Sequence, residues 1–170
     1  MRTLNTAALI LEPQTADHAE VMFVVLSDPA IYEFENAPLA SVDSLHARFS
    51  KLEARASPDG SEQWLNWVIR LTASQQLAGY VQATISDQHA LLAYELSSKH
   101  WGKGIAQEAV SAVLQELAQH YGIKQYFAIL KRCNVRSKKL LDKLGFVQAS
   151  ATELLVLKPD TDEDAMFRSA

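Results

Sequence analysis

A change of hydrophobic period in the second half of the chain limits the folds open to it. Residues 90–96 form an apolar, strand-like run, residues 105–121 repeat apolar side chains at helical spacing, and residues 125–130 form a second apolar run. A strand, a helix and a strand in this order make a crossover, which sets the two strands parallel. The sequence therefore predicts a β-α-β unit in this half of the chain.

The rest of the chain supplies antiparallel strands and further helices. Residues 64–71, 79–85 and 90–96 are rich in aromatic and β-branched side chains and are separated by polar turns, which predicts an antiparallel meander. The other expected elements are a strand at 9–13, helices near 15–26, 42–56 and 134–144, and at least one strand within 146–157. The fold class that follows is α+β around a mixed sheet.

Length and composition exclude several classes of protein. The chain has 170 residues, 48% of them hydrophobic, which predicts one domain over residues 1–170. A net charge of −4 without a basic block disfavours nucleic acid as a partner. No apolar run is long enough for a membrane span, and Cys133 is the single cysteine, so we expect no membrane partner, no internal disulfide and a cytoplasmic location.

A turn with two glycines joins the strand to the long helix. Gly102 and Gly104 flank Lys103, and Lys99 precedes them. The first amides of a helix lack partners and carry a partial positive charge, and glycines let an anion approach them closely. The turn therefore fits a phosphate or pyrophosphate, although a tight turn that uses glycine only for its dihedral angles remains an alternative.

Two familiar nucleotide-binding loops do not match this turn. The dinucleotide fingerprint needs a small residue where the chain has Gln107, and an acidic residue after the next strand, where the chain has Leu130-Lys131-Arg132. The nucleotide P-loop needs Ser or Thr after Gly102-Lys103, and Gly104 stands there. Nicotinamide cofactors, ATP and GTP are therefore disfavoured.

Three motifs together carry a family resemblance. They are Lys99-His100-Trp101-Gly102-Lys103-Gly104-Ile105-Ala106, the preceding Tyr94-Glu95-Leu96, and Asn134-x-x-Ser137 followed by Leu144-Gly145-Phe146. Over about residues 78–146 the chain resembles the GNAT superfamily of acetyl-CoA-dependent N-acetyltransferases, most closely the branch of ribosomal-protein N-terminal (serine/alanine) acetyltransferases. The resemblance implies a mixed, mostly antiparallel central sheet with a β-α-β crossover and helices on both faces.

The resemblance also implies how acetyl-CoA is held. The family's Gln/Arg-x-x-Gly-x-Gly/Ala motif cradles the pyrophosphate, and its asparagine contacts the pantetheine arm or the site around the thiol. A backbone N–H from the strand before the turn contacts the thioester carbonyl. The residues at these positions are Leu96, Lys99, Gly102, Lys103, Gly104, Ile105, Ala106 and Asn134.

The sequence departs from the family pattern at two positions. Lys99 replaces the usual Gln or Arg, which keeps a donor but weakens the case for a bidentate contact. Leu141 stands where many members carry the tyrosine that protonates the leaving thiolate. In the branch named above a serine three residues after the asparagine is a proposed substitute, so Ser137 is the candidate acid; the alternative is a serine that only caps or hydrates its helix.

The chemistry requires a free amine. At pH 7 only about one lysine amine in two thousand, or one α-amine in ten, is unprotonated, so a general base is expected. Glu95, an acid in an otherwise apolar strand, is the candidate; the alternative is that it points to solvent. Glu33 and Glu35 lie where the family builds one wall of the acceptor site and could hold a cationic amine, or belong to a solvated loop.

Three functions remain open at this point. The first is an N-acetyltransferase that transfers the acetyl group directly to a primary amine, such as a peptide N-terminus, an amino acid or a small amine, in a ternary complex without acylation of Cys133. The second is a non-catalytic module that binds coenzyme A, and the third is a nucleotide-binding protein of another fold. The five histidines show no metal-ligand spacing, so no metal is expected; a homodimer is left open.

Overall fold

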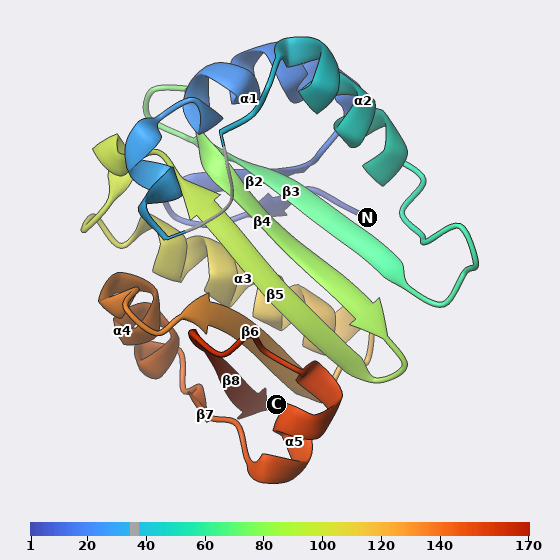
Figure 1. The fold of residues 1–170 in the computed structure, drawn as a ribbon. Helices are drawn as coiled ribbons and strands as arrows, with labels where there is room; N and C mark the ends of the chain where they lie inside the picture. Colours follow the sequence, from blue (N-terminus) through green and yellow to red (C-terminus); the bar gives the residue numbers. More distant parts are fainter. Residues whose placement is uncertain (35–37) are drawn as a thin grey trace.

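One sheet runs through the computed structural model, which describes residues 1–34 and 38–170. Its eight strands lie in the order β1-β2-β3-β4-β5-β6-β8-β7 (Figure 1). Their bounds are β1 Leu4–Asn5, β2 Leu9–Pro13, β3 Gln63–Leu71, β4 Leu77–Ser86, β5 His89–Leu96, β6 Gln125–Lys131, β7 Val147–Gln148 and β8 Glu163–Ser169.

The strand pairing confirms the predicted crossover. Strands β1 to β5 form an antiparallel meander, and β6 pairs antiparallel with β8. Strand β6 is parallel to β5, with His89 opposite Gln125 and Leu92 opposite Ala128. The sheet is therefore mixed and mostly antiparallel, and helix α3 (Ile105–His120) makes the crossover between the parallel neighbours β5 and β6.

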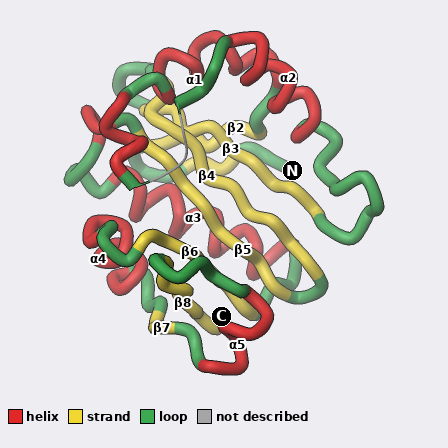
Figure 2. The backbone as a smooth tube through the Cα atoms, viewed as in Figure 1, coloured by secondary structure: helices red, strands yellow, loops and turns green. Residues whose placement is uncertain are grey.

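Helices cover both faces of the sheet, as Figures 1 and 2 show. Helices α1 (Ala19–Leu26) and α2 (Val42–Leu52) pack on one face with Val68 and Tyr80. Helix α3 and helix α4 (Val135–Lys143) lie on the other. Because neighbouring residues of a strand point to opposite faces, β3 and β4 each supply side chains to both layers. The predicted fold class is confirmed.

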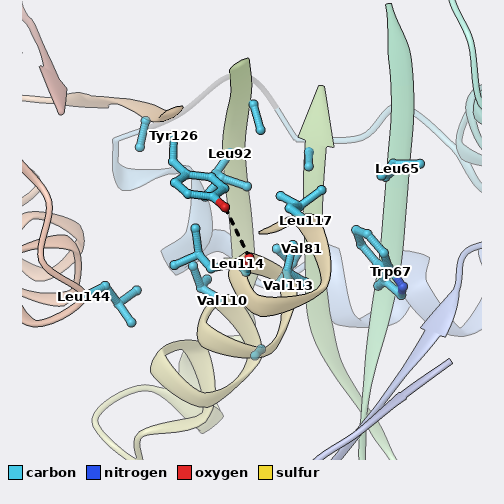
Figure 3. Packing of buried hydrophobic residues seen from close by; sticks show 14 of the residues in the cluster. Leu65, Trp67, Val81, Leu92, Val110, Val113, Leu114, Leu117, Tyr126 and Leu144 are labelled. Atoms are coloured by element: carbon cyan, nitrogen blue, oxygen red, sulfur yellow. Dashed lines mark hydrogen bonds between the residues drawn. The ribbon is translucent and has the colours of Figure 1, made fainter. Parts of the chain in front are cut away.

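The larger core lies between the sheet and α3. Trp67 of β3 is fully buried there, and its indole nitrogen donates to the carbonyl of Arg2 at 3.1 Å. Tyr126 of β6 packs against Leu114 and Leu117 of α3 (Figure 3). Its hydroxyl donates to the carbonyl oxygen of Ile123 at 2.9 Å. These apolar contacts fix α3, and with it the turn at its N-terminus, against the sheet.

The second helix is shorter than the sequence predicted. It ends at Leu52 instead of Ala56. Arg55 adopts a positive φ of 58°, and Ala56 already forms an isolated bridge with Gln63 of β3. The chain is therefore turning into the next strand where apolar spacing alone extended the helix.

The C-terminal segment differs most from the prediction. Only Val147–Gln148 forms a strand within 146–157, and residues Ala151–Leu157 form helix α5. Ser150 caps this helix by accepting a hydrogen bond from the Glu153 amide, an arrangement that the Ser-x-x-Glu spacing could have revealed. The long final strand, β8, pairs with β6 over seven residues and was missed.

Candidate active site

Strands β5 and β6 separate at their carboxyl ends. Their pairing stops at Leu92 and Ala128, although β5 continues to Leu96 and β6 to Lys131. The two arrows diverge in Figure 1, and a cavity of about 450 Å³ opens between them. Ligand clefts of enzymes are commonly found at the carboxyl ends of parallel strands, so this opening is the candidate site.

The N-terminus of α3 forms one end of the cleft. Gly104 is the N-cap residue, with φ 79° and no side-chain hydrogen bond to the helix, and Gly102 has φ 72°. Both glycines line the cleft, and a Cβ atom built on either would meet nothing within 4 Å. The space next to these main-chain amides is therefore open to a ligand.

Basic side chains surround the same turn. Lys103 Nζ donates to the carbonyl oxygen of Lys99 at 2.6 Å, and both lysines are exposed. Burial lowers the pKa of His100, and the positive charges of Lys103 and Lys99 lower it further. An anion at the turn would lie in this positive potential.

Glu95 lies at the cleft on the face that carries α1 and α2. It is opposite Tyr80 on β4, a residue of the smaller core on that face. Burial raises the pKa of Glu95 above its ordinary value, while a hydrogen bond from Tyr80 and the charge of Arg48 act in the opposite direction. Glu95 is therefore half-buried at the cleft with Tyr80 as a hydrogen-bond partner, and is not a fully exposed side chain.

Helix α4 contributes another part of the cleft lining. Asn134 is its N-cap residue, and Asn134 Oδ1 accepts a hydrogen bond from the Ser137 amide at 3.1 Å. The Ser137 hydroxyl is within 2.6 Å of the Tyr94 hydroxyl of β5. Ser137 thus has a specific hydroxyl partner in the cleft and is more than a solvated residue of the first turn.

Tyr94 is the residue that sequence reasoning missed. Leu141, at the position where the tyrosine was expected, is only 1% exposed and belongs to the core. Tyr94 brings a phenol to the cleft from a different element, and burial raises its pKa to about 12. No short-range signal joins it to Ser137, because 43 residues separate the two in the chain.

The 3₁₀ helix η2 (Pro29–Glu33) and the adjacent Phe34 close the remaining side. Arg136 of α4 pairs with Glu33 at 3.1 Å and stacks over the Trp101 ring, with 3.7 Å from its Cζ to the ring centroid. Glu33 is therefore bound to a cation of the chain itself. Glu35, the other acid proposed for the acceptor wall, lies outside the described residues.

Asp28 ties η2 to the glycine turn. Its carboxylate accepts hydrogen bonds from the Ser98 amide at 2.7 Å, the Ser97 hydroxyl at 3.1 Å and the Ala30 amide at 3.1 Å. These bonds to the ionised form, chiefly those from Ser98, lower the pKa of Asp28 to about 2. Helix η2 and the residues just before the glycine turn are thereby held together.

The cleft brings together most of the residues singled out from the sequence. Those that line it are Glu95, Leu96, Gly102, Gly104, Ile105, Ala106, Asn134 and Ser137. Lys99 and Lys103 belong to the same turn but do not line the cavity. Among residues 1–34 and 38–170, no group of three or more His, Cys, Asp or Glu side chains could hold a metal ion. No helix in that part of the chain is long and apolar enough to cross a membrane.

A second, larger hollow lacks this chemistry. It is an open groove of about 880 Å³ between β1 and α3. Its buried carboxylate, Glu116, is already paired with Arg2 at 2.7 Å. The cleft between β5 and β6 is therefore the better candidate for a catalytic site.

The mixed sheet parts beside a glycine turn, and a half-buried carboxylate and a pair of hydroxyl groups lie at the opening. The family model described as "Acetyltransferase (GNAT) domain" matches residues 8–147. The chain belongs to this family and is an acetyl-CoA-dependent N-acetyltransferase.

Individual relatives agree with the family assignment. The chain is 26% identical over 146 residues to the uncharacterized N-acetyltransferase YoaA of Bacillus subtilis (strain 168), covering 84% of this chain and 81% of YoaA. RimL, the ribosomal L7/L12 alpha-N-protein acetyltransferase, in complex with coenzyme A has a similar fold, with a TM-score of 0.82, 13% identity, and coverage of 98% and 97% of the two chains. The ribosomal-protein-S5-alanine acetyltransferase from Vibrio fischeri gives a TM-score of 0.79, 16% identity, and coverage of 98% and 96%.

Proposed function

We propose that this protein transfers the acetyl group of acetyl-CoA directly to a primary amine in a ternary complex. The acceptor is a peptide N-terminus, an amino acid or a small amine. The observation that carries the proposal is the cleft between β5 and β6, which is lined by Glu95 of β5 and by Ser137 of α4. The RimL complex with coenzyme A, which shares this fold, supports acetyl-CoA as the co-substrate.

The glycine turn is the proposed seat of the pyrophosphate. Main-chain amides from Gly102 to Ala106 donate to it, and Lys99 and Lys103 add positive charge. The open space beside both glycines supports this fit, because a Cβ atom there would stand between the amides and the anion. Asn134 contacts the pantetheine arm, and the Leu96 amide donates to the thioester carbonyl.

The two faces of the sheet serve different reactants in this proposal. Tyr94 and Glu95 are neighbours on one strand and therefore point to opposite faces. Tyr94 packs against the core that includes α3, whereas Glu95 faces the layer of α1 and α2. The co-substrate thus enters from the α3 side and the amine from the α1 side, and they meet in the gap. Such an arrangement favours direct transfer, and exposed Cys133 takes no part.

Glu95 and Ser137 have separate roles in the proton balance of the reaction. Glu95 removes one proton from the acceptor ammonium, and the resulting amine attacks the thioester carbonyl carbon. As the C–S bond breaks, Ser137 gives its proton to the sulfur. The nitrogen loses its second proton when the amide forms, and that proton returns to Ser137 by way of water. The products are an acetamide, the free thiol and one proton released from Glu95.

The same proposal includes the setting of the reaction. Residues 1–170 act as one acetyltransferase domain, which is supported by the single sheet from β1 to β8. A cytoplasmic location is supported by the single, free cysteine.

Ligand binding and thiol release test the proposal in sequence. Melting temperatures are measured with acetyl-CoA, coenzyme A, NAD and ATP, because a ligand that binds only the folded state raises the melting temperature. Thiol release from acetyl-CoA is then measured over peptides, amino acids and polyamines. We expect stabilisation by acetyl-CoA and coenzyme A alone, and thiol release that depends on a primary amine. Stabilisation without thiol release from any amine would instead indicate a non-catalytic coenzyme A module.

A further inference from the structure

The hydroxyls of Tyr94 and Ser137 form a pair at the cleft. Their oxygen atoms are 2.6 Å apart, at the short end of the range for such bonds. Both residues line the cavity, and they come from different elements, β5 and α4. The pair therefore couples the central strand to the helix that carries the candidate acid.

The chemistry of the two groups sets the direction of this hydrogen bond. A phenol is a stronger donor than an aliphatic alcohol, so the favoured arrangement has Tyr94 donating to Ser137 Oγ. Burial raises the pKa of Tyr94 to about 12, so the phenol stays protonated at working pH. The hydrogen of Ser137 is then free to point elsewhere in the cleft.

The backbone around Ser137 fixes the other end. Its amide donates to Asn134 Oδ1 at 3.1 Å, which holds the first turn of α4 in place. A serine side chain otherwise rotates among three staggered positions, and a hydroxyl hydrogen rotates to suit its surroundings. A donor at a fixed position removes much of that freedom.

We propose that Tyr94 is a positioning residue for acetyl transfer: its hydroxyl donates to Ser137 Oγ and so aims the Ser137 hydrogen at the sulfur of coenzyme A. This inference rests on the proposed function and adds a residue to it. The accepted hydrogen bond also makes the Ser137 hydroxyl a better donor to a thiolate. As Ser137 gives its hydrogen to the sulfur, the Tyr94 proton shifts toward Ser137 Oγ, and the proton that returns from the reacting nitrogen by way of water restores both hydroxyls.

Binding of free coenzyme A tests the pair without an acceptor. Affinities for coenzyme A and desulfo-coenzyme A are measured by calorimetry from pH 6 to 10. The ratio of the two affinities gives the contribution of the thiol to binding. A donor aimed at the thiolate makes the ratio rise with pH, by about tenfold for each unit by which the thiol pKa falls on binding. We expect this rise in the wild type, a smaller one in Tyr94→Phe and none in Ser137→Ala.

Turnover tests whether Tyr94 acts through Ser137. With an acceptor found in the thiol-release panel, Tyr94→Phe and Ser137→Ala are each expected to lower kcat by about 10- to 100-fold, with little change in KM for acetyl-CoA. The double variant is expected to be no slower than Ser137→Ala alone. Losses that multiply would show that Tyr94 acts by another route and would overturn the proposal.

A matched control separates positioning from general stability. Tyr126→Phe also removes a buried tyrosine hydroxyl, which donates to the Ile123 carbonyl just after the C-terminal end of α3; neither residue lines the cleft. We expect it to lower the melting temperature without changing kcat or the affinity ratio. A pH dependence of the ratio that is the same in wild type, Tyr94→Phe and Ser137→Ala overturns the inference.

The outcomes also separate this inference from the proposed function. A ratio that rises with pH in the wild type, rises less in Tyr94→Phe and does not rise in Ser137→Ala supports the pair even if no amine is acetylated, in which case the proposed function fails alone. Acetyl transfer that proceeds at the wild-type rate in Tyr94→Phe overturns the inference alone. Failure of coenzyme A to bind overturns both.

Discussion

At the scale of single residues, Glu95 combines two opposing demands. Its burial favours the neutral acid and raises its pKa, yet a general base must be ionised to accept a proton. A raised pKa brings the carboxylate closer to the pH at which amines begin to lose protons, which makes it a better base near neutrality. The same burial opposes stability once the group ionises.

Glu95→Gln is expected to lower kcat by about 10²–10⁴-fold, because the variant has no group to deprotonate the acceptor. The loss should be greater at pH 6 than at pH 9, since an α-amine with a pKa of about 8 is largely unprotonated at the higher pH. Rates of thiol release across this range provide the measurement. Glu20→Gln, which removes one exposed charge from α1, serves as the control. An identical pH–rate profile in Glu95→Gln and wild type would remove Glu95 from the base role.

The stability of Glu95→Gln provides an independent test of the raised pKa of Glu95. Since the folded pKa of Glu95 is raised, the folded state holds more protons than the unfolded state between the two pKa values. The free energy of unfolding of the wild type therefore falls as pH rises through that window. The stabilising contribution of Glu95 is fully present only below the pKa that this residue has in the unfolded chain. The melting temperature of the variant relative to wild type should rise between pH 4 and pH 8.

At the scale of elements, the end of β5 depends on close contact with β4. Gly79 is paired with Leu96, and a Cβ atom on Gly79 would lie 2.0 Å from the Glu95 carbonyl oxygen and 2.8 Å from Leu96 Cα. Both of these atoms belong to the backbone of β5, so the clash cannot be relieved by rotation of a side chain. On the other side of β4, its pairing with β3 shifts register at the same position: Ile69 is opposite Gly79, whereas Arg70 is opposite Leu77. The position of β5 thus depends on a glycine that does not line the cleft.

Gly79→Ala is expected to force β4 and β5 apart. Overpacking of this kind costs about 1–3 kcal/mol in the free energy of unfolding, and the displaced Leu96 amide should also lower kcat. Gly60→Ala is the control for lost stability without a clash: at φ 74° it should cost about 1–2 kcal/mol through its backbone angle, but an added Cβ atom meets nothing within 4 Å and turnover should not change. Denaturant unfolding and thiol release are measured for both. If Gly79→Ala matches Gly60→Ala in stability and turnover, the close contact does not set the position of β5.

Local patterns predicted the elements that build the cleft. The strands at 90–96 and 125–130 and the helix from Ile105 were each visible as a periodic run, and Gly122 does adopt a positive φ of 67° after α3. The last strand escaped because Glu163–Ser169 alternates poorly and is defined by its pairing with β6, about forty residues earlier. The Tyr94–Ser137 bond was hidden for the same reason: long-range pairing leaves no local pattern.

At the scale of the whole molecule, the candidate site depends on a gap between two strands of the sheet. Strands β5 and β6 are held together by four residue pairs at their amino ends and part at their carboxyl ends. The N-terminus of helix α3 lies at this gap. The helix is fixed by the large core between it and the sheet, in which Val110, Val113 and Leu117 are buried. In the proposed complex the co-substrate binds the first amides of this well-packed helix, and the protein needs little reorganisation to bind it.

The most direct test of the account is the affinity for acetyl-CoA of wild type, Gly104→Ala and Gly122→Ala. Gly104 and Gly122 lie just before and just after α3, with φ 79° and 67°, and an added Cβ atom would contact nothing within 4 Å at either. Each substitution should cost about 1–2 kcal/mol of stability through its backbone angle.

Calorimetry should then separate the two glycines. The account predicts that Gly104→Ala weakens acetyl-CoA binding by about tenfold or more, equivalent to about 1.4 kcal/mol, whereas Gly122→Ala binds as the wild type does. Equal affinities in all three proteins would contradict the claim that the main-chain amides at the start of α3 hold the pyrophosphate.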